Sequence, residues 1–144
     1  MNDLIKQFEG CKLLAYRDPG SKDGLPITIA YGATMYEDGT KIKLGDVITQ
    51  ERANSLLQLD IDKRTNALAA MNLNLNSNQF DAITSFVYNV GISAFESSTM
   101  LKKIKANPND ATIKSEFMKW IKNNGNVMKG LITRRTLEAN LYFS

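Results

Sequence analysis

The chain contains no histidine and a single cysteine, Cys11, among its 144 residues. These absences exclude catalytic triads that depend on histidine, zinc sites built from cysteine and histidine, and intramolecular disulfides. An enzyme of this composition that works without a metal must move protons with Asp, Glu, Lys, Tyr or water. Because no histidine can activate Cys11, we expect a half-buried thiol there and not a nucleophile. A divalent cation on carboxylates is the alternative that this composition leaves open, but the acidic stretches lack the spacing of an EF-hand. We expect no metal and no cofactor.

Long apolar runs are missing as well. The N-terminal stretch MNDLIKQFEG lacks the apolar core of a signal peptide, and no later window approaches the roughly 18 apolar residues of a membrane span. We therefore expect a soluble protein made in the cytoplasm, without stable membrane insertion. The 18 Lys and Arg against 15 Asp and Glu favour an anionic partner only slightly. The lysines at 102, 103 and 105 have no interleaved aromatic residues, so we expect a solvated helix face and no nucleic-acid site.

The pattern along the chain changes near residue 49. Before it, seven glycines and prolines interrupt short β-prone runs within residues 11–48, which predicts a small antiparallel sheet with a hairpin turn at 37–39. Asn2 or Asp3 is expected to cap a short first helix that stops at Gly10. From Thr49 apolar residues recur at helical spacing to about residue 72. Further helices are predicted over residues 77–91, 97–106, 110–122 and 131–142, with a loop at 123–126.

These patterns predict one α+β domain over residues 1–144 with two lobes. A small N-terminal lobe, about 11–48, holds the sheet. A larger helical lobe, about 73–144, is expected to take residues 1–10 against it. The helix over about 49–72 joins the two, since some twenty residues at 1.5 Å each span near 30 Å.

Two carboxylates and one hydroxyl lie close together in the N-terminal part of the sequence. Glu9 ends the first predicted helix. Asp18 begins a Pro-Gly loop, with eight residues between it and Glu9, and Thr28 opens the run TIAYGAT. Cleavage of a glycosidic bond needs one carboxyl group that donates a proton and a second that stays charged beside the developing oxocarbenium ion. Solvated surface charge is the alternative interpretation of such a pair, and the spacing alone does not decide between them.

The stretch FEGCKLLAYRDPG followed by TIAYG resembles the N-terminal signature of the phage-type lysozymes, the muramidase endolysins. The later stretches NQFDAITSFVYNVGISAFESSTML and KGLITRRTLEANLY are similar to the family's helical-lobe motifs, so the resemblance spans nearly the whole chain. It implies a lysozyme-like fold and hydrolysis of the β-1,4 bond between N-acetylmuramic acid and N-acetylglucosamine in peptidoglycan. Resemblance to the family, with a water-orienting threonine, favours inversion.

The resemblance also assigns roles by position. Glu9 becomes the general acid, Asp18 the second carboxylate and Thr28 the residue that orients the attacking water. Arg135 becomes a supporting cation facing Glu9, with a surface ion pair as the alternative. Tyr88, Asn89 and Thr34 become substrate-binding residues. An ordinary core aromatic is the alternative for Tyr88, and hydrogen bonding at a helix end is the alternative for Asn89.

The chain departs from the family pattern at three places. Nine residues, where five are usual, separate Asp18 from Thr28, so the loop at 19–27 is enlarged. Ala30 replaces an expected glycine, which costs on the order of 1 kcal/mol if the position needs a positive φ. Ala33 stands where the family often has a histidine, which we take to be structural. We expect none of these changes to abolish catalysis.

Two other functions remain open at this stage. One is a catalytically weakened homologue that still binds peptidoglycan, and the other is a nucleic-acid-binding helical module. For the enzyme, the family implies the peptidoglycan glycan strand as the partner, a monomer, and a holin that gives access to the cell wall in the periplasm or outside.

Overall fold

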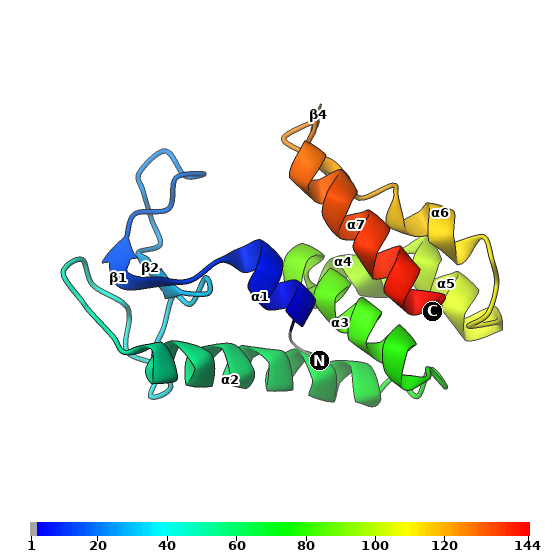
Figure 1. The fold of residues 1–144 in the computed structure, drawn as a ribbon, viewed down its shortest axis with the longest axis horizontal. Helices are drawn as coiled ribbons and strands as arrows, with labels where there is room; N and C mark the ends of the chain where they lie inside the picture. Colours follow the sequence, from blue (N-terminus) through cyan, green and yellow to red (C-terminus); the bar gives the residue numbers. More distant parts are fainter. Residues whose placement is uncertain (1–2) are drawn as a thin grey trace. The chain divides into compact units, whose positions relative to one another are not determined.

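The computed structural model describes residues 3–144, so the predicted cap at Asn2 lies outside the described residues. The fold is α+β, as predicted, with one pair of short strands after the first helix and a second pair between the last two helices (Figure 1). The described elements are α1 (Asp3–Glu9), β1 (Lys12–Tyr16), β2 (Thr28–Ala30), α2 (Gln50–Ala69), α3 (Ser77–Val90), α4 (Ile92–Glu96), α5 (Thr99–Ala106), α6 (Ile113–Phe117), β3 (Lys122–Asn123), β4 (Asn126–Val127) and α7 (Lys129–Tyr142).

The chain separates into two compact units. The sheet unit is Lys6–Lys63, and the helical unit combines the start of the chain through Ile5 with Arg64–Ser144. Helix α2 crosses the boundary between them. The lobe limits expected from the sequence stay a prediction.

The sheet unit is built around the antiparallel pair β1 and β2. Lys12 pairs with Ala30 and Tyr16 with Thr28, so four steps along β1 match two along β2 and β1 is bulged. The backbone near residues 46–48 extends this pairing, because the Ala15 N–H donates to the Asp46 carbonyl at 2.9 Å. The buried apolar residues of this unit include small and branched side chains: Ala15, Ile29, Ile42, Ile48, Ala53, Leu56, Leu57 and Ile61.

Helix α2 begins where the sequence predicts. The Thr49 hydroxyl accepts a hydrogen bond from the Arg52 N–H at 3.2 Å, which satisfies one of the free amides at the helix start. The helix ends at Ala69, a few residues before the predicted end. Asn72 and Asn74, which follow, have positive φ angles of 53° and 57°, a conformation that asparagine tolerates better than most residues and that ends a helix.

The helical unit packs around Phe86 of α3. Phe95, Phe117 and Trp120 contact the ring of Phe86 edge to face, with centroid distances of 5.6 to 6.2 Å. Edge-to-face packing suits the charge distribution of aromatic rings and adds stabilisation beyond the buried area. Helix α7 packs along α3 (Figure 1). The unit is therefore organised by two long helices with an aromatic core beside them.

Three local elements of the helical unit differ from the prediction. Residues 110–122, predicted as one helix, form only the five-residue α6, because backbone bonds of turn type precede and follow it. The predicted loop at 123–126 is the turn of the β3–β4 hairpin, where Asn124 and Gly125 have φ angles of 52° and 80°. Two residues with positive φ suit a tight hairpin turn. Helix α4 was not predicted.

Candidate active site

Glu9 is the last residue of α1, and its side chain is half-buried. The next residue, Gly10, has a φ of 64°, the left-handed conformation that commonly ends a helix and that glycine adopts without a steric cost. The sequence thus places the carboxylate where the chain leaves the helix and turns into β1.

Asp18 is half-buried and organises the loop that it begins. Its Oδ1 accepts a hydrogen bond from the Gly20 N–H at 2.9 Å. Its own N–H donates to the Gly24 carbonyl at 2.8 Å. The first bond fixes the carboxylate orientation, and the second closes the enlarged loop upon itself at its base. Gly24, at a φ of 71°, packs close to the Arg17 side chain, so a larger residue there would clash.

Thr28 opens β2 and is 8% exposed. Its hydroxyl donates a hydrogen bond to the Pro26 carbonyl at 3.0 Å. Since the proton of the hydroxyl is used in this bond, the oxygen lone pairs stay available to accept a hydrogen bond from another group.

Tyr16 was not predicted as a site residue, but it lies beside Thr28 and is affected by the charges of both carboxylates. It pairs directly with Thr28 across the sheet, which places the two side chains on one face. Burial raises the pKa of the Tyr16 phenol most, and the negative charges of Asp18 and Glu9 raise it further. Both carboxylates therefore lie within electrostatic range of this one phenol. Alternation along an extended chain, which directs residues 16 and 18 to one side, could have indicated it.

Ala30 adopts the left-handed conformation, with a φ of 59°. It lies in a turn that two backbone hydrogen bonds close, since Ile29 and Ala33 each donate to the carbonyl of the other at 2.9 Å. Ala30 is 2% exposed and Ala33 is 7% exposed, so both methyl groups are buried. The chain keeps this turn although alanine stands in a conformation that favours glycine.

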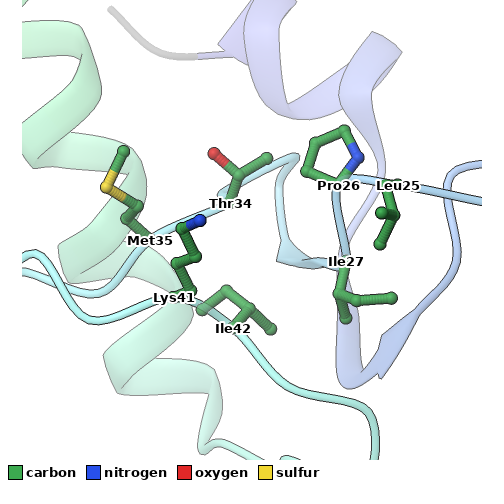
Figure 2. A pocket seen from close by; sticks show the side chains of 7 residues that line it. All are labelled: Leu25, Pro26, Ile27, Thr34, Met35, Lys41 and Ile42. Atoms are coloured by element: carbon green, nitrogen blue, oxygen red, sulfur yellow. The ribbon is translucent and has the colours of Figure 1, made fainter.

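Thr34 lies at the edge of a hollow in the sheet unit. The hollow has a volume of about 410 Å³ and is lined by Leu25, Pro26, Ile27, Thr34, Met35, Lys41 and Ile42. Figure 2 shows the Leu25 to Ile27 segment on one side and the other four residues facing it. We name this hollow the loop pocket, because the enlarged loop supplies one wall.

The other three predicted site residues belong to the helical unit. Tyr88 is half-buried, and the guanidinium of Arg64 lies 4.6 Å from the centre of its ring. Asn89 is exposed near the end of α3, and its Oδ1 accepts a hydrogen bond from Arg135. Substrate contact by Tyr88 and Asn89 stays a prediction.

Arg135 is fully buried, and its partners within the helical unit satisfy its charge. Its Nη1 lies 2.5 Å from Glu138 Oε1, and its Nε donates to the Trp120 carbonyl at 2.9 Å. Burial lowers the pKa of Arg135, and the charge of Glu138 opposes that shift. Glu138 also pairs with Arg134 at 3.2 Å, so one buried carboxylate serves two cations. The predicted role of Arg135 opposite Glu9 stays a prediction.

Two further kinds of feature that bear on function are metal-binding clusters and membrane-spanning helices. Across residues 3–144 the structure has no group of three or more His, Cys, Asp and Glu side chains that could hold a metal ion. None of the helices in the same range is long and apolar enough to cross a membrane.

Comparison with known proteins identifies the class to which this fold and site belong. Residues 6–138 match the model of the phage lysozyme family, and the chain belongs to that family. It is 39% identical to an endolysin of Acyrthosiphon pisum secondary endosymbiont phage 1, over 98% of this chain and 93% of the relative. It is 37% identical to the endolysin of Bacillus phage PZA, over 99% of this chain but only 53% of that longer relative.

Solved structures agree with the sequence relatives. An endolysin from Escherichia coli O157:H7 phage FAHEc1 superposes with a TM-score of 0.82 at 34% identity, covering 99% of this chain and 89% of that chain. A mutant of P22 lysozyme superposes with a TM-score of 0.80 at 32% identity, covering 99% and 94%. These matches confirm the lysozyme-like fold class predicted from the sequence.

Proposed function

We propose that this chain is an endolysin-type lysozyme that hydrolyses the β-1,4 bond between N-acetylmuramic acid and N-acetylglucosamine in bacterial peptidoglycan. The observation that carries the proposal is the grouping of Glu9, Asp18 and Thr28 around Tyr16 within one compact unit. Family membership supports it, because relatives over nearly the whole chain are endolysins.

In the proposed reaction Glu9 gives its proton to the glycosidic oxygen as the bond to the sugar carbon breaks. Asp18 stays negative and stabilises the positive charge that develops on that sugar. Its bond from the Gly20 N–H holds the carboxylate in one orientation during this step. Two carboxyl groups with these separate tasks are the minimum that the chemistry requires.

Thr28 supports the inverting course. Because its hydroxyl proton points to the Pro26 carbonyl, the oxygen accepts a hydrogen bond from water and directs a water lone pair toward the sugar carbon. Attack by water on the face opposite the leaving group inverts the anomeric configuration, and the proton that the water loses passes to the Asp18 carboxylate. Proton NMR of the first product released from a wall-sugar oligomer measures its anomeric configuration. A β product would show that the reaction retains the configuration and would contradict inversion.

Turbidity loss of a bacterial cell-wall suspension tests the catalytic assignment. Glu9→Gln keeps the shape of the side chain but removes the proton donor, so we expect turbidity loss to fall at least a hundredfold. Asp18→Asn should come close to the same loss. Circular dichroism of both variants serves as the control for folding. Equal slopes for the wild type and Glu9→Gln would favour the alternative, a weakened homologue that binds peptidoglycan.

The cellular setting follows from the family and not from the residues. We infer that the protein acts as a monomer on the cell wall and depends on a holin to reach it. Sedimentation measures the monomer, and lysis timing with and without a holin tests the dependence.

A further inference from the structure

The loop pocket has the composition of a binding site for a small amphipathic ligand. Its volume of about 410 Å³ falls in the range of small-molecule sites. Five of the seven lining side chains are apolar. Leu25 and Met35 are 51% and 55% exposed, which leaves apolar area that a ligand could cover.

Two polar groups lie at one end of this apolar pocket. Figure 2 shows the Thr34 hydroxyl and the Lys41 ammonium at one end of the pocket and the Ile27 and Ile42 side chains at the other. An ammonium and a hydroxyl at one end of an apolar hollow suit a ligand that has a small apolar body and a carboxylate.

The loop pocket is joined to the catalytic residue Thr28 through the backbone. Ile27, which lines the pocket, directly precedes Thr28, and the carbonyl of Pro26 accepts the Thr28 hydroxyl bond. A ligand group in the pocket would therefore rest on the same backbone segment that orients Thr28. This continuity favours a part of the substrate over an unrelated molecule as the occupant.

We propose that the loop pocket binds the acidic peptide that peptidoglycan carries on its muramic acid sugars, and this inference rests on the proposed function. Such a peptide combines alanine methyl groups with free carboxylates, which match the apolar walls and Lys41. A neutral sugar ring matches them poorly, because its hydroxyls would meet Leu25, Met35 and Ile42 without hydrogen-bond partners. Leu25, Pro26 and Ile27 of the enlarged loop thus form one wall of a subsite for this peptide.

Methyl NMR of methionine-labelled protein tests the site without any turnover. The probe is N-acetylmuramyl-L-alanyl-D-glutamate, and Met35→Leu identifies the Met35 signal among the six methionines. We expect the Met35 methyl signal to move with probe concentration. The neutral dimer of N-acetylglucosamine at the same concentrations should leave it in place.

Two lysine variants separate a specific contact from general attraction. Lys41→Met should raise the dissociation constant of the probe about three- to fivefold, the size expected for one exposed ion pair. Lys43→Met is the matched control, since Lys43 is exposed on the same segment but does not line the pocket, and it should change the constant less than twofold. An equal rise of the dissociation constant in both variants, or a Met35 signal that does not move, would overturn the inference.

The binding test and the turbidity test fail separately. Clear lysis of cell walls with an unmoved Met35 signal would overturn the peptide site and leave the lysozyme proposal intact. A moving Met35 signal that responds to Lys41→Met, in a protein that does not clear cell walls, would support the peptide site and overturn the catalytic proposal.

Discussion

At the scale of single residues, Ala30 illustrates how a functional turn tolerates an unfavourable side chain. A left-handed conformation costs an L-residue about 1 to 2 kcal/mol. Two terms offset part of this cost, because alanine restricts the unfolded chain more than glycine does and its methyl group is buried. Both offsetting terms are near 1 kcal/mol, so the balance at this position is close to zero.

We therefore expect Ala30→Gly to change the free energy of unfolding by less than about 1 kcal/mol. Ala30→Val should destabilise the protein by more than about 2 kcal/mol, since a β-branched side chain fits poorly at positive φ and the site is already filled. Urea unfolding at neutral pH measures both variants. A large gain for Ala30→Gly would mean that the strain at this turn exceeds our estimate.

The buried carboxylate of Glu138 balances the charge of two buried arginines in the helical unit. It pairs with Arg134 and Arg135, and the Ser85 hydroxyl donates to it at 2.5 Å. Glu138→Gln should cost about 3 to 5 kcal/mol, because it removes the buried negative charge that the Arg134 and Arg135 guanidiniums share.

Thermal unfolding with a surface control measures this cost. Glu37→Gln removes the partner of Arg52 in a pair whose side chains are 44% and 48% exposed, and it should cost less than about 1 kcal/mol. Similar losses in the two variants would show that burial does not set the strength of the Glu138 pairs.

At the scale of elements, the start of α3 shows how a helix end is fixed by a short sequence. Asn76 accepts a hydrogen bond from the Gln79 N–H at 2.8 Å, and the Gln79 side chain accepts one from the Asn76 N–H at 3.0 Å. This reciprocal capping box satisfies two groups that the helix itself cannot pair.

Asn76→Ala should lower the free energy of unfolding by about 1 kcal/mol, because one capping bond is lost. The matched control is Asn140→Ala on the exposed face of α7, where alanine favours the helix and should be neutral or slightly stabilising. The urea concentration at the unfolding midpoint compares the two variants, if the slope of the free energy against urea concentration is the same for both. Loss of stability at Asn140 equal to that at Asn76 would contradict the capping argument.

The elements predicted well from the sequence are those whose signals are local. Thr49 caps α2 and the turn at 37–39 is closed by the Tyr36 N–H to the Thr40 carbonyl at 2.8 Å, both as expected. The extent of α6 was not predictable, because apolar spacing does not reveal where turns compete with a helix. The place of Tyr16 was missed because the bulge in β1 sets its register against Thr28.

The candidate site shows the same division. Glu9, Asp18 and Thr28 could be named from the sequence because a family pattern marks them. The partners of Arg135 could not, since they come from α3, from α7 and from the backbone near Trp120, which only the fold brings together. The roles of Glu9, Asp18, Thr28 and Arg135 toward a substrate stay predictions.

At the scale of the whole molecule, the absence of histidine shapes the dependence of stability on pH. No histidine side chain titrates between about pH 5 and 8, so we expect a broad plateau there. In acid, Glu116 contributes to the loss of stability: the hydrogen bond from Lys119 lowers its pKa most, burial opposes this, and Lys103 lowers it further. Stability from a lowered carboxyl pKa is present above about pH 4.3 and is lost as the pH falls.

The alkaline limit has the opposite sign. Burial raises the pKa of Tyr142 to about 12, and its hydroxyl donates to the Pro108 carbonyl at 2.6 Å. The stability from this neutral phenol is present below about pH 10, the unfolded value, and is lost as the pH rises toward 12.

Burial also raises the pKa of Asp81. In acid, this shift partly offsets the stability that is lost when Glu116 becomes protonated.

Melting temperatures from pH 3 to 11 check this profile. Tyr142→Phe should flatten the alkaline decline, while Glu116→Gln should flatten the acid decline and lower the plateau. A midpoint that changes steeply between about pH 5.5 and 7.5 would contradict the expected plateau.

The division of the chain into units also bears on its synthesis. Ile5, which is 1% exposed, belongs to the helical unit. After Ile5, the next residue of that unit along the chain is Arg64. A ribosome that adds about 5 to 20 residues per second needs several seconds more to deliver the residues from Arg64 onward. During that interval all residues of the sheet unit have been synthesised. The later residues of the unit that buries Ile5 have not, so Ile5 stays exposed to water. The part of the chain that carries Glu9 and Asp18 is therefore available for folding first, and the aromatic core is completed only after α7 has been synthesised.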